Sequence, residues 1–91
     1  MKKIISKHTP GSWLIQNTTK DYIFIYSDAG GDIAEIYNHS ERPKKEVLAN
    51  ARLIAMAPNM FECLKAIQNR DVVDIDEIFN LVDAILLRIE S

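Results

Sequence analysis

Apolar residues in the first forty positions fall into three short runs, and residues typical of turns separate these runs. The runs are residues 12–17 (SWLIQN), 21–27 (DYIFIYS) and 33–38 (IAEIYN). Because side chains alternate between the two faces of a strand, each run fits a β-strand. The middle run is apolar on both faces, so it is predicted to be the central strand of a three-stranded antiparallel sheet over about residues 12–38.

Two glycines, Gly30 and Gly31, lie between the second and third runs. Glycine adopts positive φ angles at little steric cost, so the segment DAGGD predicts a tight β-hairpin. The alternative of a phosphate-binding loop is disfavoured, because such a loop requires a lysine and a following helix that DAGGD lacks.

From about residue 44 the apolar period becomes helical, although Pro58 interrupts it. A proline inside a helix costs about 3 kcal/mol, whereas at the start of a new helix it costs little. We therefore predict two helical segments, about residues 44–56 and 58–69, with a sharp bend between them. The residue before proline avoids helical angles, so Ala57 is expected to be non-helical.

The buried faces of these segments can be predicted from residue spacing. In the first segment the expected stripe is Leu48, Ala51, Ile54 and Ala55, and beyond the proline it continues as Met60, Leu64 and Ile67.

The last helix is predicted over about residues 75–90. Asp74 can cap its N-terminus, with Glu77 three residues on in a capping-box relation. Its apolar stripe is broad and comprises Ile75, Ile78, Phe79, Val82, Ile85, Leu86 and Ile89. Leu81 and Leu87 lie off this stripe. So many apolar positions on one helix predict contacts on two sides, either by self-association or by docking of a partner.

These elements predict a single α+β domain over residues 1–91: a three-stranded antiparallel sheet followed by a proline-bent helix and a C-terminal helix. Ninety-one residues suit one small domain with a modest core, and 47% apolar residues exceed the content of disordered chains.

The net charge and the single cysteine argue against some classes of function and location. Eleven basic and thirteen acidic residues give a net charge of −2, so nucleic-acid binding is not indicated. Neither a signal-peptide core nor an apolar run of membrane-spanning length is present, and one cysteine fits a reducing compartment. We expect a cytoplasmic protein that does not bind membranes.

No catalytic or metal-binding constellation can be assembled from the sequence. His8 and His39 lack other ligands at the spacing of a zinc site. Cys63 is expected to be a buried, inert thiol. The acidic residues around Asp74 are explained by helix capping. We therefore expect a protein that is not an enzyme and has no cofactor or metal.

Two groups of side chains could bind a ligand if the fold brought them together. The basic group is Lys2, Lys3, Lys7, Lys44 and Lys45; the aromatic group is Trp13, Tyr22, Phe24 and Tyr26. The aromatic rings could stack on a nucleobase if one face of the sheet were open. In so small a core, however, we expect most of them to pack beneath helices.

Two motifs resemble those of a family of small uncharacterised bacteriophage and prophage proteins. HTPGSW at residues 8–13 resembles H-T-P-G-x-W, and NARLIAMAP at residues 50–58 resembles N-A-x-L-I-A-x-A-P. The resemblance covers about residues 8–67. The chain departs from the family where Asn59 follows the proline in place of the usual acidic residue, and the helix beyond residue 70 looks particular to this chain.

The resemblance implies a phage accessory role in the bacterial cytoplasm and carries over no catalytic residues. The leading hypothesis is a protein that binds a host protein, such as an inhibitor of a bacterial defence system like CRISPR-Cas. One alternative is an oligomer that sequesters a small nucleotide signal, and another is a DNA-associated phage regulator. The residues expected to contact a partner are Leu81, Leu87, Lys44 and Lys45.

Overall fold

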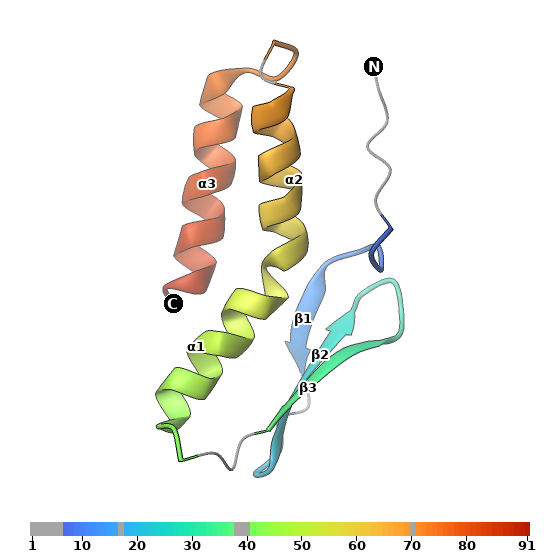
Figure 1. Cartoon of the computed structure of the whole chain (residues 1–91), viewed down its shortest axis with the longest axis vertical. Helices are drawn as coiled ribbons and strands as arrows, with labels where there is room; N and C mark the ends of the chain where they lie inside the picture. Colours follow the sequence, from blue (N-terminus) through green and yellow to red (C-terminus); the bar gives the residue numbers. More distant parts are fainter. Residues whose placement is uncertain (1–6, 17, 38–40, 70) are drawn as a thin grey trace.

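The computed structural model describes residues 7–16, 18–37, 41–69 and 71–91 (Figure 1). The elements in chain order are β1 (Trp13–Gln16), β2 (Tyr22–Ser27), β3 (Asp32–Tyr37), α1 (Lys44–Ala55), α2 (Ala57–Gln68) and α3 (Ile75–Ile89). The predicted α+β fold, with a three-stranded sheet followed by helices, is confirmed. Lys2, Lys3 and His39 lie outside the described residues.

The sheet has the order β1-β2-β3 with both pairs antiparallel, so β2 is the central strand as predicted. Ile15 pairs with Ile25, and Ile23 pairs with Ile36, which aligns isoleucines across all three strands. The hairpin between β2 and β3 closes through Gly31, whose carbonyl accepts from the Ser27 N–H at 3.0 Å. Gly31 has a φ of +96°, which confirms the predicted use of glycine in this turn.

The first core lies between the sheet and α1. The isoleucines of β2 face α1, where Ile23 packs with Val47 and Ala51. Ala51 is 0% exposed, because its small side chain lets α1 approach the sheet closely. The buried row of α1 is Val47, Ala51 and Ala55, at four-residue spacing. The expected place of Ile54 on this row is wrong: its side chain lies to one side of the row and is exposed.

The chain bends sharply between α1 and α2, as Pro58 predicts, but the break lies at Met56 rather than Ala57. Met56 adopts φ −90° and ψ 2°, while Ala57 is already the first residue of α2. Placing the break there separates the proline ring from the carbonyl of the preceding turn, with which it would clash in a continuous helix. Pro58 lies buried in the first turn of α2.

A second core lies in the helical hairpin formed by α2 and α3, which run antiparallel (Figure 1). Met56, Cys63 and Ile85 are buried there, with Met60, Val82 and Ile89 packed against them. Asp74 caps α3 as predicted, and its Oδ1 accepts from the N–H of Asp76 at 3.0 Å.

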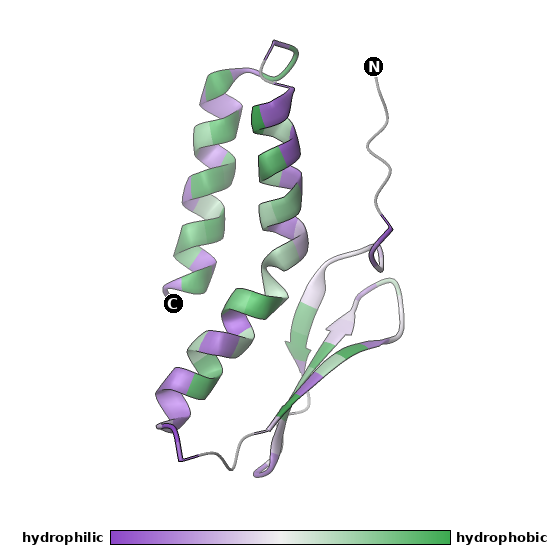
Figure 2. Ribbon diagram, in the orientation of Figure 1, coloured by the Kyte–Doolittle hydropathy of each residue, from purple (hydrophilic) through white to green (hydrophobic). Residues whose placement is uncertain are grey.

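The hairpin buries fewer apolar residues than the sequence predicts. Leu64 and Ile67, expected on the buried face of α2, are exposed, as are Phe79 and Leu86 of α3. Figure 2 shows hydrophobic residues in green on successive turns of α3. Along most of the hairpin each helix has only the other as a helical neighbour, and α1 meets α3 near its C-terminal end, so only the middle of a broad apolar stripe is covered (Figure 1).

No helix in the described part of the chain combines the length and the apolar character that crossing a membrane requires.

Candidate functional site

The sheet has one face that the helices leave open. Figure 1 shows the helices grouped on one side of the sheet. Side chains alternate along β2, so Tyr22, Phe24 and Tyr26 lie on the side opposite the isoleucines that face α1. Tyr37 of β3 joins them, because it is the cross-strand partner of Tyr22. We call Tyr22, Phe24, Tyr26 and Tyr37 the aromatic face.

The rings of the aromatic face contact one another in a continuous row. The ring centroids are 5.8 Å apart for Tyr22 and Tyr37, 6.0 Å for Tyr22 and Phe24, and 6.4 Å for Phe24 and Tyr26. These separations lie in the range of favourable aromatic pairs. The row is therefore held in place by its own packing and presents a firm surface.

The expectation that most aromatic residues pack beneath helices is wrong for this row. Tyr22 is 38% exposed and Tyr37 is 55% exposed. Trp13 does lie on the covered side, where its indole N–H donates to the Thr9 carbonyl at 3.2 Å. One short helix, α1, covers the sheet, so only one face can be buried.

His8 packs against aromatic rings on the covered side of the sheet. Its ring is edge-on to Trp13 at 6.0 Å and to Phe61 of α2 at 5.1 Å. His8 therefore connects the segment before β1 to the helical hairpin, and it is half-buried rather than a free surface histidine.

The strands that form the aromatic face carry acidic side chains and no basic ones. β1, β2 and β3, which the structure describes throughout, contain no Lys or Arg. Glu35 lies directly across from Phe24, and Asp32 lies at the start of β3. A phosphate group would meet carboxylates here and no cation from the strands, so the face suits an apolar ligand with positive charge at its margin.

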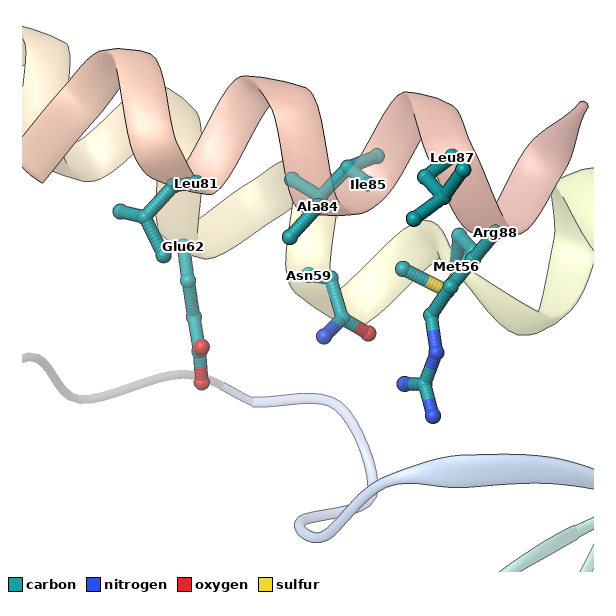
Figure 3. Close-up of a pocket in the computed structure, with 8 residues that line it drawn as sticks. All are labelled: Met56, Asn59, Glu62, Leu81, Ala84, Ile85, Leu87 and Arg88. Atoms are coloured by element: carbon teal, nitrogen blue, oxygen red, sulfur yellow. The ribbon is translucent and has the colours of Figure 1, made fainter.

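A second candidate site is a groove of about 290 Å³ on one side of the helical hairpin (Figure 3). It is lined by Met56, Asn59, Glu62, Leu81, Ala84, Ile85, Leu87 and Arg88. Its volume lies just below the range typical of ligand pockets, which begins at about 300 Å³. In Figure 3 the side chains of Glu62 and Arg88 point to the same side of the groove.

The structure separates the four residues expected to contact a partner. Leu81 and Leu87 both lie in the groove and are exposed. Lys44 and Lys45 occupy the first turn of α1, at the end of that helix remote from the hairpin. They are exposed beside Arg42 and Glu46, which form an ion pair at 3.0 Å.

Cys63 is buried between α2 and α3, as predicted. Within the described residues, no group of three or more His, Cys, Asp or Glu side chains is arranged to hold a metal ion.

The family model of Salmonella phage P22 protein Y8K6 matches residues 1–85. The chain belongs to this family. Membership confirms the resemblance to small phage proteins. It also corrects the boundary of that resemblance, because the Y8K6 match extends beyond residue 70 and includes most of α3. No curated protein and no solved structure matches the chain.

Sequence reasoning missed Tyr37 and overestimated how much of the aromatic row is covered. A signal was present: aromatic residues at alternate positions of a central strand form a face of their own. The chain also supplies one helix directly after the sheet, which is enough to cover only the opposite face.

Proposed function

We propose that this member of the Y8K6 family is a non-enzymatic phage accessory protein that binds a host protein through its aromatic face. The observation that supports the proposal is a row of four rings left open on a three-stranded sheet, with Tyr37 the most exposed. Tyrosine and phenylalanine are enriched in protein interfaces, and tyrosine is among the residues that contribute most to binding energy.

The charge of the sheet indicates the chemistry of the host partner. With Asp32 and Glu35 in its strands and no Lys or Arg there, the aromatic face suits an apolar surface surrounded by basic residues. Defence proteins that hold nucleic acid in positively charged channels present basic residues that would complement Asp32 and Glu35. We propose an inhibitor of a bacterial defence system of this kind, CRISPR-Cas being one example, that acts in the host cytoplasm.

Capture of the partner tests this proposal. Tagged protein is incubated with lysates of defence-carrying host strains, and bound proteins are quantified by mass spectrometry. The double variant Tyr22→Ala and Tyr37→Ala is compared with the matched control Leu81→Ala and Leu87→Ala, which truncates two exposed apolar residues in the groove. We expect one basic host protein to bind the unaltered chain and the control, and binding to the aromatic variant to fall at least about tenfold.

Two other results would contradict the proposal. Undiminished capture by the Tyr22 and Tyr37 variant would exclude the aromatic face. Loss of capture in the control would instead assign binding to the groove that contains Leu81 and Leu87.

A second candidate function is sequestration of a small nucleotide signal. The near-parallel rings of Phe24 and Tyr26, at an interplanar angle of 19°, favour it because nucleobases stack on such rings. The lack of cations in the strands argues against it. A rise in melting temperature on adding cyclic nucleotides would support sequestration over host-protein binding. The DNA-regulator hypothesis is the weakest of the three, given the acidic sheet and the net charge of −2.

A further inference from the structure

The two helices of the hairpin have the same arrangement of apolar residues. On α3 the residues that pack in the hairpin core are Val82, Ile85 and Ile89; on α2 they are Met60 and Cys63. Ile78 of α3 is buried as well. On α3 the spacing between these positions alternates between four and three residues. On α2 Met60 and Cys63 are three residues apart, and Met56 lies four residues before Met60, which is the same pattern and is typical of helices that pack side by side.

At three of the core positions, one on α2 and two on α3, the next residue is apolar and exposed. Leu64 follows Cys63, Phe79 follows Ile78, and Leu86 follows Ile85. Leu64 is 66% exposed and Phe79 is 58% exposed. In an antiparallel pair, residues at the same offset from the packing stripe project to the same side of the hairpin. Together with their neighbours they form one surface, the outer apolar face: Leu64, Ile67, Ile75, Phe79 and Leu86.

The opposite side of the hairpin has a different composition. There the residues directly before the core positions line the groove, and they include Asn59 and Glu62 of α2 and Arg88 of α3. The groove side therefore mixes charged and amide side chains with the apolar residues Leu81, Ala84 and Leu87, whereas the outer apolar face has exposed apolar residues on both helices. Two helices that are apolar at the packing positions and again on one flank have the pattern of helices in a bundle, where each helix has two neighbours.

We propose that a second copy of this chain covers the outer apolar face, so that two hairpins form a four-helix bundle. The five residues of the face, with Val72 beside them at 76% exposure, leave on the order of 500 Å² of apolar surface open. A stable interface takes about 800 Å² from each partner, which this face supplies once its polar margin is included. A two-fold dimer is the commonest oligomer, and it places identical faces together.

The charges along the hairpin determine how the two copies are oriented. Asp76, Asp83 and Glu90 recur every seven residues along the outer edge of α3. The matching edge of α2 carries Gln68 and Lys65 instead. Packing α3 against α3 would place two acidic rows together, whereas packing α3 against α2 of the second copy avoids this repulsion. The two-fold axis therefore runs parallel to the helices.

Sedimentation equilibrium tests the dimer with a matched pair of variants. At tens of micromolar we expect the unaltered chain to have twice its 10.4 kDa mass. Leu64→Glu places a carboxylate in the proposed interface and should weaken self-association by roughly 100-fold or more. Leu87→Glu makes the same change at a residue 73% exposed on the groove side, and it should leave the dimer intact.

The dependence of melting temperature on concentration provides a second test that needs no variant. Because dissociation and unfolding are coupled in a dimer, the melting temperature of the unaltered chain should rise with protein concentration, and that of Leu64→Glu should not. A monomeric mass for the unaltered chain overturns the proposal. So does a trimer or larger assembly, a dimer that survives Leu64→Glu, or one that Leu87→Glu dissociates.

Discussion

The sheet with α1 and the helical hairpin differ in how completely they bury their apolar residues. Ile25 of the central strand and Ala51 of α1 are both 0% exposed. In the hairpin the best-buried residues, such as Cys63 and Ile85, still retain some exposure, and the five residues of the outer apolar face are open. The sheet and α1 therefore enclose their contact residues almost completely, whereas the hairpin encloses its own only in part.

The difference follows from the shapes of the elements. A small sheet presents a flat surface, and a single helix with alanines on its contact row can lie close to it and cover it. Two antiparallel helices touch along one narrow line, so a helix with a broad apolar stripe keeps part of that stripe uncovered. The hairpin is the half of the molecule whose stability should depend on another protein surface.

The largest expected effect is that of a cavity in the core between the sheet and α1. Ile25→Ala should lower the free energy of unfolding by about 4 kcal/mol, because the cavity beneath α1 is fully enclosed. Ile78→Ala, the matched change in the hairpin, should cost about 2 kcal/mol, because its site is less enclosed and can collapse more readily. Urea denaturation followed by circular dichroism measures both. Equal losses would show that the two cores are equally complete.

A smaller loss of stability is expected when a side chain is added to Gly11, in the turn before β1. Gly11 has a φ of +90°, and a Cβ there would meet the carboxylate of Asp28 and lie 2.8 Å from Ser27 Oγ. Asp28 accepts from the Ser12 N–H at 2.9 Å, so the clash would disturb a bond that holds the turn. Gly11→Ala should cost about 2 to 3 kcal/mol in the same assay.

Gly30→Ala is the control for this change. It has a similar φ of +106° but nothing near its Cβ position, so it should cost only about 1 kcal/mol of backbone strain. Equal effects for the two glycines would mean that backbone strain, and not the crowding around Gly11, determines the loss.

A smaller effect is expected at the start of α3. Asp74→Ala removes the side chain that accepts from the Asp76 N–H, and it should lower the unfolding free energy by about 1 kcal/mol. Asp71→Ala, an exposed aspartate three residues earlier, should change it by far less. Thermal unfolding compares the two, and a similar loss in both would indicate an effect of net charge rather than of capping.

The smallest effect is expected at the ion pair before α1. The guanidinium of Arg42 donates to Glu46 at 3.0 Å, with side-chain exposures of 64% and 46%. Arg42→Ala should cost about 0.4 kcal/mol at low salt and less at high salt, because water and ions screen the pair. A loss that did not depend on salt would point to packing by the arginine stem instead.

The order of the elements could be predicted because local signals determine it. The alternation in β2, the pair Gly30 and Gly31, and Pro58 each act over a few residues. Which face of each element is covered could not be predicted in the same way. The spacing of Leu64 and Phe79 shows that each lies beside the apolar stripe of its helix. Whether their side chains are buried depends on how many other elements surround that helix.

The candidate sites show the same limit. Leu81 and Leu87 could be picked from α3 alone, yet the groove they line also requires Asn59 and Glu62 of α2, and only the hairpin brings these together. The openness of the aromatic face likewise depends on the number of helices near the sheet and not on the residues of β2.

Cys63 gives the molecule a built-in reporter. It is the single cysteine of the chain, and its thiol is enclosed between α2 and α3. Because the thiol is nearly enclosed, alkylation should be much faster when the hairpin opens, so the labelling rate in native buffer reports how often the two helices part. The unaltered sequence therefore allows the opening of the hairpin to be timed without introducing a probe.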